Sequence, residues 1–153
     1  MFGKKAETNI DSNELEFRRM KGIGIVYYSI VTSKVVFEEN RFLVERLRKI
    51  FYVKGKTQND AVDYGSIEKV EVKTNFALID LIYGLVIGGI CLVGGEVLWG
   101  LVALALFLFC SYGKKITVTR KDASKMVIQS DGIGQRAQIE AFRKKLGEKG
   151  VAV

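Results

Sequence analysis

The stretch FALIDLIYGLVIGGICLVGGEVLWGLVALALFLFCSY, residues 76–112, decides how this chain is organised. It contains no Lys or Arg, and its only charged residues are Asp80 and Glu96. As one helix, at ~1.5 Å per residue, it would measure ~55 Å, whereas the hydrocarbon core of a bilayer is ~30 Å thick. The stretch is therefore too long for a single transmembrane helix.

A glycine pair divides the stretch in two. Gly94 and Gly95 are poor helix formers, and the charged Glu96 follows them directly. We therefore predict a hairpin of two transmembrane helices, about Phe76–Val93 and Val97–Tyr112.

Basic residues flank the hairpin on both sides. Lys69 and Lys73 precede it, and Lys114 and Lys115 follow it, whereas the loop between the two predicted helices has no basic residue. By the positive-inside rule, both termini face the cytoplasm. The flanks thus predict a multi-pass protein of the cell (inner or cytoplasmic) membrane.

Small residues share one face of the first predicted helix. Gly84 and Gly88 have the spacing G-x-x-x-G, and Asp80 lies on the same face. Small residues allow a second helix to approach closely. Two interpretations stay open: packing between the two helices of the hairpin, and self-association or docking against a helix of a membrane partner. Asp80 is either an intramembrane polar contact or a cap of the first helix at the interface.

The composition argues against an enzyme. The 153 residues include no His and only two Cys, which leaves no Ser-His-Asp triad, no histidine metal site and no disulfide framework. The run Gly132-Ile-Gly134-Gln-Arg-Ala137 resembles a dinucleotide turn, but no second parallel strand can follow it. We expect no catalytic residue, no metal and no cofactor.

The polar parts of the chain predict an α+β domain split by the hairpin. Residues 1–22 form a polar N-terminal segment with a short helix over 12–20, where Asp11 and Glu14 provide the capping pattern. Residues 23–74 read as strands, residues 75–113 as the hairpin, and residues 114–153 as two strands and a closing helix over 135–148.

This order of elements resembles bacterial pleckstrin-homology-like (PH-like) membrane proteins. The residues that carry the resemblance are Asp63–Lys73 before the hairpin, and Lys115–Asp122 and Gln138–Phe142 after it. The resemblance implies a small antiparallel PH-like β-sandwich or barrel, closed by a C-terminal helix and interrupted by a two-helix transmembrane hairpin. Phe42–Ile50 departs from the pattern, because a long basic stretch stands where a compact turn is expected. The implied function is that of a scaffold, immunity-type or envelope-related protein.

A second candidate site is a basic patch with interleaved aromatic residues. Its members are Arg41, Arg46, Arg48, Lys49, Lys54 and Lys56. A negative lipid surface attracts each nearby Lys or Arg by ~1 kcal/mol. The patch either contacts anionic lipid or is a solvated basic face that sets topology, and nothing in the chain indicates nucleic-acid binding.

Three functions follow as expectations. The first is a non-enzymatic integral membrane protein whose PH-like domain docks a membrane partner or self-assembles. The alternative is recognition of anionic lipid by the basic patch. The third is a small pore or transporter subunit, for which the hairpin offers few polar lining residues.

Overall fold

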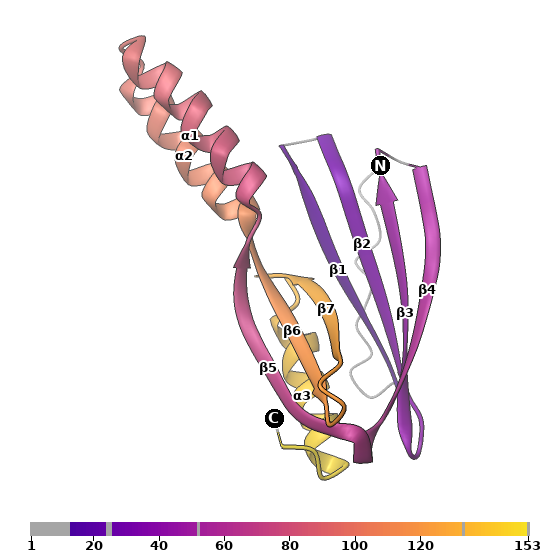
Figure 1. The fold of residues 1–153 in the computed structure, drawn as a ribbon. Coiled ribbons are helices and arrows are strands. Elements are labelled where there is room, and N and C mark those ends of the chain that lie inside the picture. Colours follow the sequence, from indigo (N-terminus) through magenta and orange to yellow (C-terminus); the bar gives the residue numbers. More distant parts are fainter. Residues whose placement is uncertain (1–12, 24–25, 52, 133, 153) are drawn as a thin grey trace.

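The computed structural model describes residues 13–23, 26–51, 53–132 and 134–152. Two antiparallel sheets, a helical hairpin and a C-terminal helix make up this part of the chain (Figure 1). The elements are, in order, β1 (Glu14–Ile23), β2 (Val26–Phe37), β3 (Arg41–Ile50), β4 (Val53–Asp63), the 3-10 turn η1 (Tyr64–Ser66), β5 (Ile67–Phe76), α1 (Leu78–Val93), α2 (Val97–Ser111), β6 (Tyr112–Arg120), β7 (Lys125–Asp131) and α3 (Arg136–Glu148).

The two sheets follow the order of the chain. The first has the strand order β1-β2-β3-β4, and the second has β5-β6-β7. Apolar residues alternate with polar ones along these strands, so each sheet has one apolar face. The turn η1 carries the chain from the first sheet to the second, which leaves the apolar faces free to pack together.

The core lies between the sheets and α3. Phe142 of α3 is fully buried, and its ring centroid lies 5.9, 5.7 and 5.8 Å from those of Phe17, Phe37 and Phe42. Ile116 and Ile128 of the second sheet are also fully buried in this cluster. Edge-to-face aromatic packing of this kind adds to the stabilisation from area burial. The helix therefore joins the two sheets into one core.

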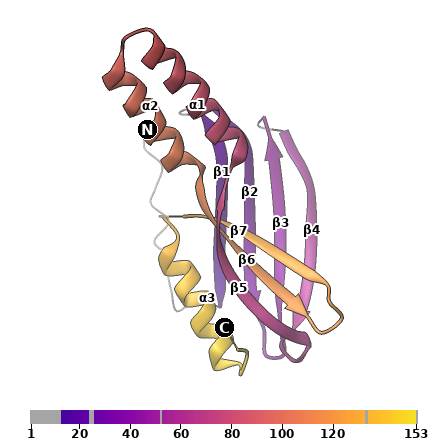
Figure 2. The same cartoon turned by 60° about the vertical axis from the view of Figure 1, so that its left-hand side comes forward.

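The helical hairpin grows out of the second sheet. β5 runs into α1 and α2 runs into β6, and the two strands stay paired up to Phe76 opposite Tyr112. The rings of these two residues lie 5.7 Å apart at the base of the hairpin. Figures 1 and 2 show α1 and α2 projecting together beyond the end of the sheets.

The structure contradicts the predicted transmembrane hairpin. Among the described residues, no helix combines the length and the apolar character needed to cross a membrane. α1 has 16 residues and α2 has 15, which correspond to ~24 and ~22 Å at ~1.5 Å per residue. The prediction counted Phe76 and Tyr112 as helical, but both residues belong to strands. The predicted multi-pass membrane localisation with two cytoplasmic termini rested on these helices and is therefore also wrong.

The PH-like resemblance is also wrong, although the α+β class fits. The sheets do not close into a barrel, because no ladder joins β1 to β7. On this side of β1 the amides are satisfied by side chains instead. Arg18 N donates to Gln135 Oε1 at 2.9 Å, and Met20 N donates to Asp131 Oδ1 at 3.1 Å.

Two local predictions change as well. Residues 14–20 form strand β1 and not a helix, because Leu15, Phe17 and Arg19 alternate inward with a period of two. Residues 1–12 lie outside the described residues. Phe42–Ile50, where the resemblance implies a compact turn, belongs to strand β3, which pairs with both β2 and β4.

Candidate binding surface

The outer surface of the helical hairpin is almost entirely apolar. In each helix the buried residues share the face that contacts the other helix: Asp80, Gly84 and Gly88 in α1, and Gly100, Phe107 and Ser111 in α2. The remaining directions carry exposed large side chains, among them Leu78, Ile82, Leu85, Val86, Ile90, Val93, Val97, Leu98, Trp99, Leu101, Val102, Leu106, Leu108 and Phe109. Exposed apolar surfaces of this extent mark interaction sites.

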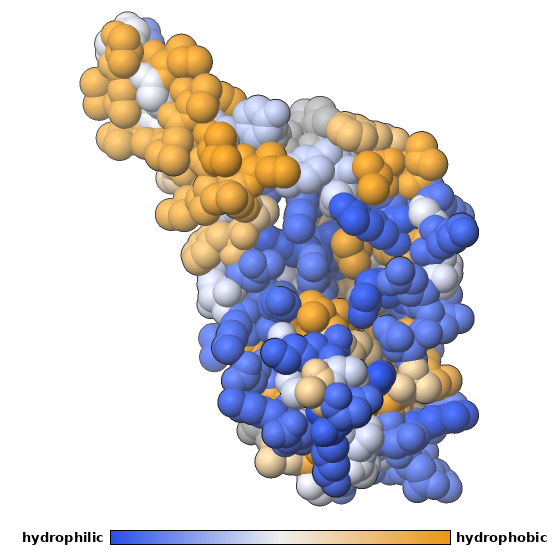
Figure 3. All heavy atoms as spheres, in the orientation of Figure 1, coloured by the Kyte–Doolittle hydropathy of each residue, from blue (hydrophilic) through white to orange (hydrophobic). Residues whose placement is uncertain are grey.

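The turn between β3 and β4 extends this apolar surface. Ile50, Phe51 and Val53 are 44%, 65% and 70% exposed. The turn lies at the same end of the molecule as the hairpin, as Figures 1 and 2 show. In Figure 3 the hairpin and the tip of this sheet appear as two apolar areas at one end of the molecule, whereas the rest of this face is mostly hydrophilic. We call the hairpin and this turn together the apolar end.

The strands divide the predicted basic patch into three parts. Lys49 and Lys54 face each other across the β3–β4 pair, next to the apolar turn. Arg41 begins β3 at the opposite end of the sheet, where its Nε lies 2.7 Å from Glu38 Oε2. The other three residues, Arg46, Arg48 and Lys56, line a groove between the two sheets.

Lys21 of β1 lines the same groove. Burial lowers the pKa of its ammonium group, and the nearby cations of Arg19 and Arg48 lower it further. The positive charge of Lys21 therefore opposes folding at neutral pH, where the group is protonated.

We expect Lys21→Met to raise the melting temperature at pH 7. Because Lys21 is partly exposed, the gain is no more than ~1 kcal/mol, or about 2–4 °C for a chain of this size. The pKa of Lys21 in the folded state lies below 10.5, so the gain in stability shrinks as the pH rises through that pKa towards 10.5. Thermal unfolding at pH 7 and pH 10 measures it, with the exposed Lys125→Met as control. A lower melting temperature of Lys21→Met at pH 7 would contradict the electrostatic explanation.

The glycine face of α1 packs inside the hairpin. A Cβ atom at Gly84 would lie 2.5 Å from Phe107 Cβ, and one at Gly88 would lie 2.6 Å from Leu104 Cγ. The two predicted packing residues thus contact α2 of the same chain. Of the two interpretations given for the glycine face, these contacts correspond to packing between the two helices of one hairpin.

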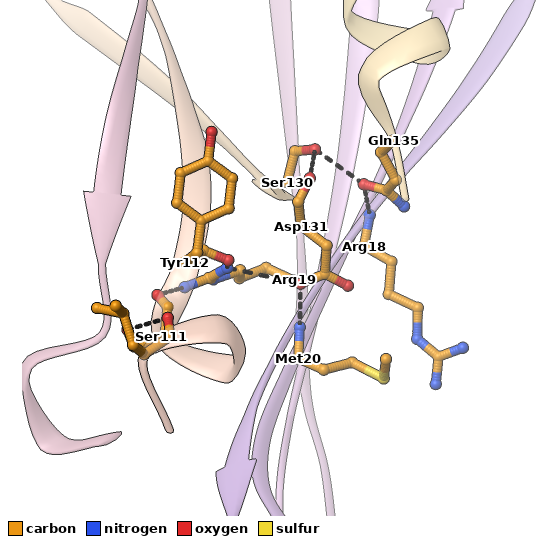
Figure 4. A network of polar contacts seen from close by, with 9 residues as sticks. Arg18, Arg19, Met20, Ser111, Tyr112, Ser130, Asp131 and Gln135 are labelled. Carbon is orange, nitrogen blue, oxygen red and sulfur yellow. Dashed lines mark hydrogen bonds and ion pairs between the residues drawn. The ribbon is translucent and has the colours of Figure 1, made fainter. Parts of the chain in front are cut away.

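A buried network joins the hairpin to the first sheet, and Figure 4 shows its members. The guanidinium of Arg19 donates from Nη1 to Tyr112 O and from Nη2 to Ser111 O, the latter at 2.6 Å. Its Nη1 also lies 3.7 Å from Asp131 Oδ1. A side chain at Gly113 would overlap this guanidinium, which explains the glycine there. Arg19 therefore caps the last turn of α2 from the neighbouring sheet.

Two carboxyl groups depend on this arginine. Asp80 is fully buried near Arg19, and neither of its oxygens has a hydrogen bond within standard distance to another described residue. Burial raises the pKa of both Asp80 and Asp131. The charge of Arg19 and the hydroxyl group of Tyr28 oppose the rise in Asp80, and the backbone amide of Met20 and the charge of Arg19 oppose it in Asp131. Asp80 thus lies at the junction and in the first turn of α1, whose N-cap residue is Ala77.

Neither a protein-family model, nor a curated protein, nor a solved structure matches this chain. The function has to be inferred from the surface itself.

The sequence did not lead us to Arg19 or Lys21, although Arg19 joins the hairpin to the first sheet and Lys21 lines the groove. Their alternation with Leu15 and Phe17 was the available signal, since it has the period of a strand. Gln129 of β7, which also lines the groove, had no signal in the sequence, because the cations of the groove come from the other sheet.

Proposed function

We propose that this chain is a non-enzymatic binding module for anionic lipid surfaces, and that its apolar end is the part that enters the lipid. The observation that carries the proposal is the exposure of large apolar side chains on every side of the hairpin except the contact between its two helices. Binding of this kind requires neither helix to cross the bilayer.

The distribution of the apolar side chains favours lipid over a folded partner. A protein partner covers one face of a hairpin, whereas here opposite faces are apolar, and a third apolar element, the β3–β4 turn, lies beside them. Acyl chains can surround all of these surfaces at once. Transfer of each Leu, Ile, Val or Phe into lipid is worth roughly −0.3 to −0.6 kcal/mol. The hairpin as a whole therefore gains several kcal/mol.

The charges next to the apolar end favour an anionic surface. Lys49 and Lys54 adjoin the apolar turn, and the chain carries a formal net charge of +7. Each basic residue close to an anionic surface is attracted by ~1 kcal/mol. Self-association through the glycine face, by comparison, would require α1 and α2 to separate, because Gly84 and Gly88 are already packed against α2.

Vesicle binding tests this function, and Trp99 reports on it. Trp99 is the single tryptophan of the chain and is 63% exposed on α2. We expect the full chain to float with phosphatidylglycerol–phosphatidylcholine vesicles and to show a blue shift of Trp99 fluorescence on binding. Binding to vesicles of phosphatidylcholine alone should be weaker but measurable. Absence of both flotation and the blue shift would overturn the proposed function.

Phe51→Asp should weaken this binding at least tenfold. The change removes one apolar side chain from the turn and adds a charge of the same sign as the lipid surface. Aspartate tolerates the positive φ of 44° at this position, so the turn should keep its conformation. The matched control is Ala123→Asp, which introduces the same charge at φ 64° in the exposed β6–β7 turn at the opposite end. Equal losses in both variants would mean that net charge and not the apolar end governs binding.

A further inference from the structure

The face of the first sheet that packs against the second sheet is apolar near one end and becomes basic further along the strands. Along β3, the residues that face the second sheet are, in order, Phe42, Val44, Arg46, Arg48 and Ile50. The first two are buried in the core, and the next two are cations that line the groove between the sheets. β1 changes in the same direction and reaches the groove with Lys21. The core thus ends where a basic groove begins.

The groove has the size and the lining of a ligand site. Its volume is about 440 Å³, within the range of ~300–1,000 Å³ that small-molecule sites occupy. Its four cations come from three strands: Lys21, Arg46, Arg48 and Lys56. Hydroxyl and amide groups accompany them, from Ser29, Gln58 and Gln129. None of the described lining residues is acidic.

The cations of the groove are poorly neutralised by the protein itself. Arg46 has one distant partner, since its Nη2 lies 3.7 Å from Asp60 Oδ2, and its buried Nε has no hydrogen bond within the described residues. In that same part of the chain, Arg48, Lys56 and Lys21 form no ion pair. Burial lowers the pKa of Lys21, and the nearby cations of Arg19 and Arg48 lower it further. An anion in the groove would offset this repulsion.

We propose that the groove between the sheets binds a phosphate group. The guanidinium groups of Arg46 and Arg48 offer forked pairs of donors that match phosphate oxygens. The ammonium groups of Lys21 and Lys56 add two more positive charges, whereas the one carboxylate paired with a groove cation within the described part of the chain is that of Asp60. The amide and hydroxyl groups supply further donors. The ligand class is a phosphate mono- or diester of headgroup size.

The place of the groove connects it to the apolar end. Ile50 lines the groove and also belongs to the exposed β3–β4 turn. A phospholipid with its acyl chains against this turn could therefore place its phosphate among Arg48, Lys56 and Lys21. In this respect the inference rests on the proposed function, whereas binding of a free organophosphate does not depend on it.

Titration of the full chain with glycerol phosphate, in a neutral phosphate-free detergent and at constant ionic strength, tests the groove directly. We expect saturable binding that weakens at least tenfold in the double variant Arg48→Gln/Lys56→Gln. Both residues are exposed, so the fold should persist. The matched control is Lys121→Gln/Arg143→Gln, which removes one exposed lysine and one exposed arginine away from the groove. Unchanged affinity of the groove variant, or no saturable binding by the unmodified chain, would overturn the proposal.

Vesicles distinguish the source of the phosphate. If the ligand is a lipid headgroup, Arg48→Gln/Lys56→Gln lowers binding to phosphatidylglycerol-containing vesicles more than the control Lys121→Gln/Arg143→Gln does, whereas Phe51→Asp lowers binding to vesicles of either composition. If the ligand is soluble, the groove variant loses only glycerol phosphate. Either pattern supports the phosphate site. Failure of the unmodified chain to bind vesicles while it still binds glycerol phosphate would overturn the proposed function alone.

Discussion

Arg19→Met is expected to destabilise the folded chain by about 3 kcal/mol, the lower end of the cost of removing one partner of a buried ion pair, because the side chain of Asp131 is 27% exposed. For a chain of this size the melting temperature should fall by about 10 °C. The substitution leaves the carboxylate of Asp131 without its cation and removes both donors to the carbonyls of Ser111 and Tyr112. Thermal unfolding measures the loss, and hydrogen exchange should show it first at the end of α2.

The neighbouring Arg18→Met is the matched control. The side chain of Arg18 is exposed, and the hydrogen bond to Gln135 is donated by the backbone amide. This variant should therefore unfold within about 0.5 kcal/mol of the unmodified chain. The double variant Arg19→Met/Asp131→Asn should recover part of the loss, because it no longer buries an unpaired carboxylate. Equal stability of Arg18→Met and Arg19→Met would show that the junction does not depend on the guanidinium.

The loss of stability caused by Arg19→Met should depend on pH. Burial raises the pKa of Asp80 and Asp131 in the folded state, so their charged forms oppose folding once the pH rises through those values. Arg19 counteracts this cost in the unmodified chain. The difference in stability between the unmodified chain and Arg19→Met should therefore be larger at pH 7 than at pH 4. A difference that is independent of pH would point to lost packing instead.

Local patterns sufficed for the second sheet and for α3. The strands read over residues 23–74 include β5, the two strands predicted after the hairpin are β6 and β7, and the closing helix lies at Arg136–Glu148. The glycine pair also divides the helices as predicted, with Gly95 at φ +85°. In each case the determining interactions lie within a few residues along the chain.

The wrong predictions concern segments whose secondary structure is determined by residues that are distant in the sequence. Phe76 and Tyr112 are apolar enough to extend a helix, but each finds a strand partner in the other, and this pairing shortens both helices. The residues around Glu14 match a helix cap locally, yet β2 pairs with the whole segment. Propensity is a weak prior that tertiary contacts override.

The six residues of the basic patch lie in three places for a geometric reason. They are close in sequence, but a strand of ten residues spans ~33 Å, so Arg41 lies far from Lys49. Alternation then divides neighbours such as Arg48 and Lys49 between two faces. The groove gains Lys21 and Gln129 from strands that only the folded chain brings near.

Gly84→Leu and Gly89→Leu should change the hairpin in opposite directions. At Gly84 even a Cβ atom would lie 2.5 Å from Phe107 Cβ, and both atoms are fixed to helix backbones, so the helices have to separate. Overpacking of this kind costs about 1–3 kcal/mol. At Gly89 nothing lies within 4 Å of a Cβ atom, and replacement of a helical glycine by leucine gains up to ~1 kcal/mol in propensity.

Hydrogen exchange of the α1 and α2 amides distinguishes the two variants. We expect faster exchange in Gly84→Leu and slower exchange in Gly89→Leu, since only the first disrupts contacts between α1 and α2. The size of the protein in detergent is the second readout, because it separates packing within one hairpin from association between copies. If Gly84→Leu reduced the size of an assembly but left the exchange unchanged, the glycine face would bind a second copy. Faster exchange at constant size is the result that packing against Phe107 predicts.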